Sequence, residues 1–370
     1  MKLLIKRETI LQPLTHVNSV VERRQTLPIL ANAYLKLEED RLWITGTDLE
    51  VEITTSIDDM KIEKEGECTI TAQKFLDICR ALPDGADIKL QSEKSKVLIQ
   101  SKRSRFTLKS LPSEDFPRID TQYWQERFTI TQSELKQLID NTSFSMAQQD
   151  VRYYLNGLLF EISKEKLISV ATDGHRLSKS ETTINGSDHV EAHQAIIPRK
   201  AITELNRLLS SDNDENVTVE LNDHHIRFTF DQIIFTSKLI DGKFPDYKSV
   251  MSAKLPVKLN LDRQEFYQTL LRASILTNDK FRGIRLGLKD SVLKVASTNP
   301  EQEEANDEMP INDYTGPDME IGFNVNYLMD ILKVLNSDKV ELSVKDGNSS
   351  CTLNIPDDKK SMYLVMPMRL

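Results

Sequence analysis

The chain repeats one outline of strands and turns three times, and this repeat constrains its fold more than any single motif does. In the middle copy, residues 155–162 alternate apolar and polar side chains, a polar turn follows, and residues 167–171 form a second strand-like run that leads to Asp173. The outline leads to Asp48 in the first copy and to Asn299 in the third, so successive copies lie 125 and 126 positions apart. The 370 residues therefore divide into three similar units.

Each copy also contains two amphipathic segments with helical spacing. Apolar residues stand at i, i+3, i+4 and i+7 from Phe75 and again from Leu328. Pro13 fits the first turn of a helix, because it has no N–H to donate. The other helices are expected at residues 9–21, 135–139, 198–209 and 266–271.

The spacing of the strands resembles that of hairpins and favours antiparallel pairing. We therefore predict an α+β fold of three repeated domains, each with antiparallel sheets packed with two helices. The domains are expected at residues 1–125, 126–252 and 253–370. Three such copies in a row suggest an arc, from which a closed head-to-tail assembly can be built.

Composition excludes several classes of protein. Hydrophobic residues make up 39% and charged residues 28% of the chain, and no apolar run reaches the roughly 18 residues of a membrane span. Lys6 and Arg7 interrupt the apolar N-terminus, which predicts a cytoplasmic protein without a signal peptide. The three scattered cysteines are expected to be free thiols in a reducing compartment. A net charge of −9 argues against binding to nucleic acid by bulk charge, but it leaves room for a local positive surface.

Catalysis and metal binding are not expected. Asp173 and His175 could belong to a hydrolase triad, but there is no G-x-S-x-G elbow, and Asp48 recurs in the repeat without a histidine nearby. The acidic run at 212–216 begins like a calcium loop but lacks the glycine and the final glutamate, so a polar turn is expected there. We therefore predict a protein that is no enzyme and needs no cofactor.

Seven short motifs resemble those of bacterial DNA polymerase III β subunits, the sliding clamps. The motifs are Thr-Leu-Pro-Ile-Leu at 26–30, Thr-Gly-Thr-Asp-Leu-Glu at 45–50, Gln-Asp-Val-Arg-Tyr-Tyr-Leu-Asn-Gly at 149–157, Val-Ala-Thr-Asp-Gly-His-Arg-Leu at 170–177, Phe-Thr-Ser-Lys-Leu at 235–239, Asn-Pro-Glu-Gln-Glu-Glu-Ala at 299–305 and Val-Met-Pro-Met-Arg-Leu at 365–370. The resemblance covers all three repeats. It implies that the chain forms half of a closed ring of six similar domains, which is a head-to-tail homodimer that encircles duplex DNA. The ring is expected to be loaded by a clamp loader and to tether the replicative polymerase. It is also expected to bind other replication and repair proteins and not to be catalytic itself.

The resemblance also implies a set of DNA contacts that carry no sequence information. Contacts to phosphates position a protein on DNA, and their strength falls with salt. Gln73 stands where the family commonly has arginine. The alternative is that the cations are ordinary surface charges and that one of the two tyrosine rings packs in the core while the other lies on the surface. The implied DNA-binding residues are Arg24, Gln73, Gln149, Tyr153, Tyr154 and Lys200.

A second implied site is an apolar cleft between the second and third repeats, in which peptides of partner proteins bind. Flexible methionines suit a site with many partners. Ser249 stands where relatives often have a basic residue. The alternative is that the tail is a last strand with a frayed end and that residues 174–176 form a plain loop. The implied cleft residues are Arg152, Leu155, Thr172, Gly174, His175, Arg176, Leu177, Pro245, Val250, Leu364, Val365, Met366, Pro367, Met368, Arg369 and Leu370.

The third implied site joins opposite ends of two copies. Opposite charges on the two ends favour head-to-tail pairing. Taken alone, Phe106 is expected to be a core residue rather than an interface residue. The implied interface residues are Lys74, Arg105, Phe106, Leu108, Ile275, Leu276, Glu301, Glu303 and Glu304.

Two other classes of function compete with a clamp on DNA. A repeat scaffold could bind peptides in the same cleft without binding DNA. The third class is an enzyme, for which the sequence contains no catalytic motif.

Overall fold

The computed structural model describes residues 1–21, 27–119, 123–184, 193–252, 254–311, 314 and 316–369. The described residues form 25 strands and seven α-helices, so the predicted α+β class is confirmed. The chain divides into two compact units, which we describe separately. The first contains Met1–Leu135 and Lys200–Leu239, and the second contains Lys136–Thr183 and Ile240–Leu370, together with residues 193–199.

The first unit contains two antiparallel sheets. The five-stranded sheet has the order β5 (Lys61–Lys64), β1 (Lys2–Lys6), β7 (Asp87–Glu93), β8 (Lys96–Ser101) and β9 (Ser104–Lys109). The eight-stranded sheet has the order β10 (Glu126–Thr131), β15 (Asn216–Leu221), β16 (His225–Phe230), β17 (Ile233–Lys238), β4 (Val51–Ile57), β3 (Arg41–Thr47), β2 (Asn32–Glu38) and β6 (Gly66–Thr71). The larger sheet thus takes strands from the first and second repeats.

The second unit follows the same plan with the second and third repeats. Its eight-stranded sheet has the order β14 (His193–Pro198), β11 (Gly157–Ser163), β12 (Lys166–Thr172), β13 (Arg176–Thr183), β25 (Ser361–Val365), β24 (Cys351–Asn354), β23 (Lys339–Val344) and β18 (Val257–Asp262). Its four-stranded sheet has the order β21 (Glu304–Pro310), β20 (Val292–Thr298), β19 (Gly283–Lys289) and β22 (Met319–Asn324).

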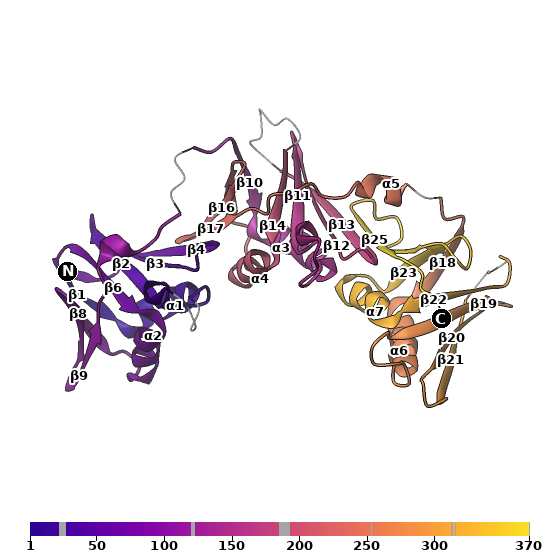
Figure 1. The fold of residues 1–370 in the computed structure, drawn as a ribbon, viewed down its shortest axis with the longest axis horizontal. Coiled ribbons are helices and arrows are strands. Elements are labelled where there is room, and N and C mark those ends of the chain that lie inside the picture. Colours follow the sequence, from indigo (N-terminus) through magenta and orange to yellow (C-terminus); the bar gives the residue numbers. More distant parts are fainter. Residues whose placement is uncertain are drawn as a thin grey trace. The chain divides into compact units, whose positions relative to one another are not determined.

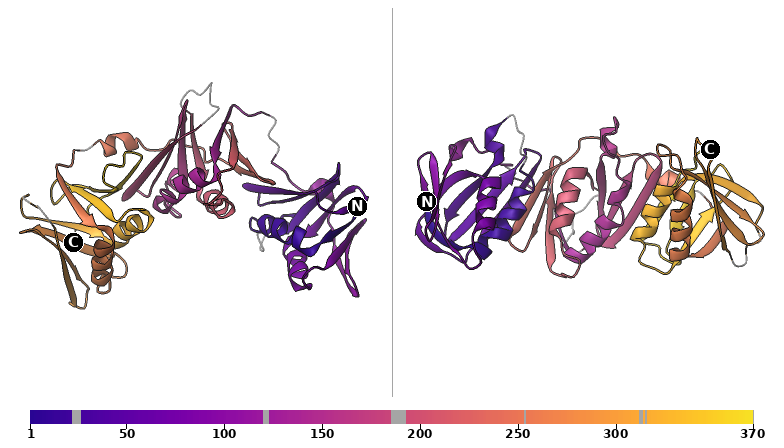
Figure 2. Two further views of the ribbon diagram at one scale, coloured as in Figure 1. Left: turned by 180° about the vertical axis from the view of Figure 1, so that it is seen from behind. Right: turned by 90° about the horizontal axis from the view of Figure 1, so that it is seen from below.

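In each unit, helices pack against the sheets (Figures 1 and 2). In the first unit, α1 (Arg7–Asn18) packs against α2 (Ala72–Ala81) and against both sheets. In the second, α6 (Arg263–Ser274) packs in the same way against α7 (Val325–Val334). The remaining elements are the helices α3 (Gln132–Asp140), α4 (Arg199–Leu208) and α5 (Tyr247–Met251) and the 3₁₀ turns η1 (Pro28–Ala31), η2 (Ser113–Asp115), η3 (Ser143–Ser145) and η4 (Tyr153–Leu155).

The helical periodicity predicted the buried faces well. α2 buries Phe75 and Cys79, and α7 buries Leu328, Ile331 and Leu332. The prediction for the first helix was less accurate, because α1 begins at residue 7 and ends at residue 18. Pro13 consequently lies inside the helix rather than in its first turn. At this interior position the proline removes one backbone hydrogen bond.

The recurring aspartate of the repeat is explained by turn chemistry. The Asp48 Oδ1 accepts the N–H groups of the residues two and three positions ahead, at 2.9 and 2.7 Å. Asp173 does the same at 2.9 and 3.0 Å, and the Oδ1 of Asn299 accepts the N–H of Glu303 at 2.9 Å. Each side chain therefore holds the turn into the next strand, which is a favoured role for Asp and Asn.

The same turn also links two repeats within the first unit. The second oxygen of Asp48, whose side chain is 4% exposed, forms an ion pair of 2.5 Å with Lys200 of α4. We predict that Asp48→Ala lowers the free energy of unfolding by about 1–3 kcal/mol, because two backbone N–H donors and a cation lose their acceptor. Asp48→Asn should cost less, since it keeps the turn and loses only the ion pair.

Urea titration of the three proteins measures these differences. Asp59→Ala is the matched control, because Asp59 is exposed. Equal stability of Asp48→Ala and Asp59→Ala would contradict this account of the turn.

Candidate functional site

An apolar hollow of about 210 Å³ lies within the second unit. It is bounded by η4, by the turn between β12 and β13, by α5 and by the end of β25. Leu177 and Leu364 form its buried floor, and Val250 and Met366, each 42% exposed, lie at its rim. Its lining residues are Arg152, Tyr154, Leu155, Thr172, Gly174, Arg176, Leu177, Pro245, Asp246, Tyr247, Val250, Leu364 and Met366.

The floor of the hollow is built by strand pairing between distant parts of the sequence. In the ladder of β13 and β25, Leu177 is opposite Leu364. The ladder continues into the tail, where the N–H of Met366 donates to the carbonyl of His175 at 2.8 Å. The C-terminal segment is thus fixed as one wall of the hollow.

A buried carboxylate anchors the helix that forms the lip. Glu161 of β11 accepts hydrogen bonds from Lys248 (2.6 Å), Tyr247 (3.2 Å) and Gln194 (3.1 Å). Lys248 and Tyr247 belong to α5, whose N-terminus is capped by Asp246. Burial acts to raise the pKa of Glu161, but the Lys248 ammonium and the other donors outweigh it, so the pKa is lowered. The ionised carboxylate therefore holds α5 over the hollow.

Arg152 packs over a glycine at the mouth of the hollow. Its guanidinium binds both oxygens of Asp150, at 3.0 and 2.9 Å. Gly174 has a φ of +87°, and a Cβ at this position would lie 3.0 Å from the Arg152 guanidinium. A side chain at position 174 would therefore strain the turn and displace Arg152.

Ten of the residues that the sequence predicted for the cleft line this hollow, and Tyr154, Asp246 and Tyr247 are additional. Val365 is fully buried within the sheet, and the N–H of Met368 donates to Gly322 at 2.9 Å. The predicted residues His175 and Pro367 adjoin lining residues in the sequence, Arg369 lies further along the tail, and Leu370 lies outside the described residues. The resemblance had already placed Pro245 and Val250, the second of which lies on α5, in the cleft, whereas Asp246 and Tyr247 of the same segment were not predicted.

The residues predicted to bind DNA are divided between the two units. Gln73, on α2 of the first unit, is hydrogen-bonded to Asn18 and Asp77. Lys200 forms the ion pair with Asp48. In the second unit, Gln149 is exposed, and Tyr153 meets Tyr154 edge to face at 5.8 Å. Tyr153 is 57% exposed, whereas Tyr154 is partly buried and packs against a cluster of core residues, so one ring lies on the surface and the other packs against the core. Arg24 lies outside the described residues.

The residues predicted for the dimer interface occur in both units, and several of them belong to edge strands of the sheets. In the first unit, Arg105, Phe106 and Leu108 belong to β9, the edge strand of the five-stranded sheet, and Lys74 is exposed on α2. Phe106 and Leu108 are partly exposed, so Phe106 is not a core residue.

In the second unit, Glu304 begins β21, the edge strand of the four-stranded sheet. Glu301 and Glu303 are exposed just before it. Ile275 is 74% exposed and Leu276 is partly exposed. Phe281, at 55% exposure, was not singled out by the sequence pattern.

Groups that could perform chemistry are engaged in structural contacts. The Asp173 carboxylate is bound by backbone amides and by Arg176, and the segment at 212–215 is the turn between α4 and β15. All three cysteines are free and buried, and burial raises the pKa of each thiol to about 12. Within the described ranges, no group of three or more His, Cys, Asp or Glu side chains could hold a metal, and no helix could span a membrane.

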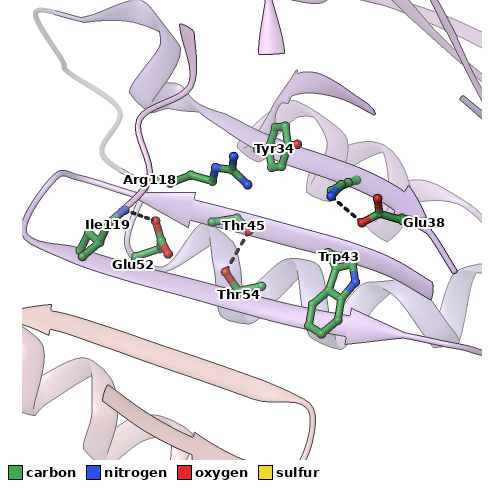
Figure 3. Close-up of a pocket in the computed structure, with 9 residues that line it drawn as sticks. Tyr34, Glu38, Trp43, Thr45, Glu52, Thr54, Arg118 and Ile119 are labelled. Atoms are coloured by element: carbon green, nitrogen blue, oxygen red, sulfur yellow. Dashed lines mark hydrogen bonds and ion pairs between the residues drawn. The ribbon is translucent and has the colours of Figure 1, made fainter. Parts of the chain in front are cut away.

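A second hollow, of about 680 Å³, lies in the first unit over β2, β3 and β4 (Figure 3). Arg118 stacks on Tyr34 at 5.4 Å, and burial raises the pKa of Glu52, which accepts a backbone N–H at 2.9 Å. The lining contains two cationic side chains, Lys36 and Arg118, and two carboxylates, Glu38 and Glu52, so the numbers of basic and acidic groups are equal. The lining residues are Tyr34, Lys36, Glu38, Trp43, Thr45, Glu52, Thr54, Arg118 and Ile119, none of which the sequence predicted as a site residue.

The three repeats match models of three protein-family domains. The models describe the N-terminal, central and C-terminal domains of the DNA polymerase III beta subunit, and they match residues 1–120, 129–246 and 248–369.

The similarity to curated proteins and solved structures extends over the whole chain. The beta sliding clamp of Pseudomonas aeruginosa is 48% identical over 99% of both chains, and that of Escherichia coli is 43% identical over 100% of both. The crystal structure of the P. aeruginosa DNA polymerase III subunit beta has a TM-score of 0.96 at 47% identity, and a P. aeruginosa sliding clamp bound to griselimycin has 0.95 at 47%. Both structures cover 100% of this chain and are themselves covered completely.

The anchoring of α5 by Glu161 predicts a dependence of stability on pH. Because the folded pKa lies below the unfolded value, ionised Glu161 stabilises the fold above the unfolded pKa of about 4.5, and this contribution is lost as the pH falls through the folded pKa. Glu161→Gln should lower the free energy of unfolding by about 1–3 kcal/mol at pH 7. The difference from the unsubstituted protein should shrink on acidification.

Urea titrations at pH 7 and at about pH 3.5 measure this change. Glu165→Gln, at an exposed turn position, is the control. A difference that stays constant or grows on acidification would contradict the role of the ionised carboxylate.

Proposed function

This chain belongs to the family of the DNA polymerase III beta subunit, the sliding clamps, and on that premise we propose that it encircles duplex DNA as a head-to-tail homodimeric ring. In this role it is a processivity factor that tethers the replicative polymerase and other DNA enzymes. The observation that carries the proposal is similarity across the full length of the chain, with none of the three domains missing. The role needs no catalytic group, and a cytoplasmic location belongs to the same proposal.

The division into domains at 1–125, 126–252 and 253–370 is part of the proposal. The family models support it, since each falls almost wholly within one of these ranges. The two compact units divide the chain differently, because each eight-stranded sheet combines strands of two repeats. Sequence repeats and compact units are thus different divisions of one chain.

The hollow in the second unit is the proposed docking cleft for partner peptides. Its buried leucine floor supplies apolar area, and the exposed Met366 supplies a flexible wall that can fit different side chains. Burial of apolar surface in a preformed hollow is the usual source of affinity at such sites. A related clamp from P. aeruginosa binds griselimycin, and we propose that this chain binds the same compound in the cleft.

The junctions inside each unit suggest how two copies join. In the first unit, Val51, whose N–H is bound by the turn aspartate, pairs with Ser237 of β17. In the second unit, the equivalent Arg176 pairs with Val365 of β25. In the third repeat the equivalent residue is Glu303, and β21 after it is an edge strand.

The last strand of the first repeat is β9, which is also an edge strand. Phe106 of β9 corresponds to Phe235 of β17, because the two hairpins have the same register. Phe106 pairs with Ile99 and Phe235 pairs with Phe228, in each case the residue seven positions earlier. Ser237 therefore corresponds to Leu108. By this equivalence, β21 of one copy pairs with β9 of a second copy, with Glu303 opposite the other copy's Leu108. In this register, Glu304 and Glu308 lie diagonally across from Arg105 of the other copy, and opposite charges favour the pairing.

The proposed DNA contacts are few and independent of sequence. Lys200 is already paired with Asp48, so a phosphate would have to compete with a carboxylate for it. The net charge of −9 also opposes strong electrostatic binding. Both features suit a protein that is retained by encirclement and still slides.

We expect the protein, once loaded by a clamp loader onto a nicked circular plasmid, to remain with the DNA during gel filtration. Cutting the circle once should release it, since a ring can slide off an end. Retention that is equal on circles and linear DNA would contradict encirclement. An absence of retention on both would favour the rival function, a peptide-binding scaffold that does not bind DNA.

The proposed pairing of β21 with β9 can be tested by cross-linking. Opposite residues of an antiparallel pair lie about 4.5–5.5 Å apart, within reach of a disulfide. Glu303→Cys combined with Leu108→Cys should therefore yield covalent dimers of the 42.4 kDa chain on a non-reducing gel. In the control, Asp307→Cys with Leu108→Cys, the pair is shifted by four residues, about 13 Å. Equal cross-linking of both pairs, or none of either, would refute the register.

A further inference from the structure

Two arginines beside the hollow in the first unit are stacked on aromatic rings but pair with no carboxylate. The guanidinium of Arg118 lies 5.4 Å from the centre of the Tyr34 ring, and that of Arg41 lies 5.6 Å from the centre of the Trp43 ring. Both rings line the hollow. Among the described residues, none forms an ion pair with either guanidinium or accepts a hydrogen bond from it. Both cations are therefore available to an acidic ligand.

The ring against which Arg118 stacks is itself fixed. The Tyr34 hydroxyl donates to Glu67 at 2.5 Å, the ring stacks on Phe116 at 5.5 Å, and the residue is only 5% exposed. Figure 3 shows Arg118 reaching over the sheet toward this ring. A guanidinium that is held against a fixed ring loses little freedom when its donor fork binds a carboxylate or a phosphate.

A buried carboxylate in the same hollow has an oxygen to spare. Glu52 is 9% exposed, and its Oε2 accepts the N–H of Ile119 at 2.9 Å. Its Oε1 accepts no hydrogen bond from any residue in the described part of the chain. Buried polar groups are normally hydrogen-bonded, and an ionised carboxylate can accept several donors. Ile119 shows that a backbone N–H fits this carboxylate, so Oε1 can accept a second one from a ligand.

The free groups together favour a peptide with an acidic side chain over a nucleic acid. Lys36 and Glu38 of the lining already pair with each other at 2.5 Å. Single-stranded DNA would suit the arginines and the rings, but its phosphates would be repelled by Glu52, and an N–H donor is needed there. A peptide offers one carboxylate for Arg118, a backbone N–H for Glu52 and an apolar side chain for Trp43.

We propose that the hollow in the first unit is a docking site for a segment of a partner protein that carries an aspartate or a glutamate. The carboxylate of the segment binds Arg118, a backbone N–H donates to Oε1 of Glu52, and an apolar side chain packs against Trp43. The volume of about 680 Å³ is usual for a ligand site, and Trp, Tyr and Arg dominate the affinity of protein interfaces. The site belongs to the first unit, and the proposed peptide cleft belongs to the second.

Selection from a phage library of random heptapeptides tests the site. The library is first cleared on Arg118→Gln, which keeps the cleft of the second unit and therefore removes the peptides that bind there. It is then selected on the unsubstituted protein. We expect to recover peptides that contain Asp or Glu together with an apolar residue. Recovery of no peptide above background, or of peptides without an acidic residue, would overturn the proposal.

A recovered peptide, labelled with fluorescein, gives the Kd by fluorescence anisotropy. Arg118→Gln should weaken binding about 10-fold, as expected for a lost charge-assisted hydrogen bond, and Arg118→Lys should restore only part of the affinity because lysine lacks the planar fork. Glu52→Gln offers one acceptor oxygen in place of two and should weaken binding about 3- to 10-fold. Arg103→Gln is the matched control, because Arg103 is an exposed arginine of the same unit, and it should bind as the unsubstituted protein does.

Melting temperatures measured on the same proteins separate binding from folding. Trp43→Leu alters the hollow without touching Arg118 or Glu52, so it tests the site even if Arg118→Gln does not fold. Affinity in Trp43→Leu and Glu52→Gln that equals that of Arg103→Gln would overturn the proposal. Oligothymidylate is the rival probe. If it binds and loses affinity in Glu52→Gln and Trp43→Leu, while no acidic peptide is recovered, the hollow is a site for single-stranded DNA and the proposal fails.

Discussion

Backbone pairing between consecutive repeats is the interaction on which the rest of the structure depends. In the first unit, β17 of the second repeat pairs with β4 of the first, and in the second unit, β25 of the third repeat pairs with β13 of the second. These ladders make one eight-stranded sheet in each unit out of strands from two repeats. The apolar hollow exists only because β25 ends beside the turn that precedes β13.

The turn before each pairing strand reuses one piece of chemistry. The aspartate that binds the backbone amides also binds a cation, which is Lys200 for Asp48 and Arg176 for Asp173. The same cations appear in the expected functional sites, one for DNA and one for the peptide cleft. Their structural partners limit what each can do, because a cation that is already paired binds a new anion only by giving up the old one. The pair of Asp48 and Lys200 joins two repeats, whereas Asp173 and Arg176 belong to the same repeat.

Much of the fold could be predicted from the sequence. The period of about 125 residues, the helices with apolar residues at i, i+3, i+4 and i+7, and the α+β class followed from local patterns. Pro13 shows where such reasoning failed, since packing overrode the preference of proline for a first turn. The anchoring of α5 by Glu161 could not have been foreseen, because the two partners lie 87 positions apart and neither belongs to a motif.

The sequence by itself determined the repeat, the buried faces of the helices and the resemblance to the clamp family, because each of these depends on the identity of residues at fixed spacing. Only the tertiary structure decided which strands pair across repeats, that Arg176 lies over a ring of α7, and that Tyr247 lines the cleft. The physical reason is that ladder hydrogen bonds join main-chain groups, which are the same in nearly every residue. Long-range partners are therefore selected by the packing of whole elements, and the local sequence does not encode them.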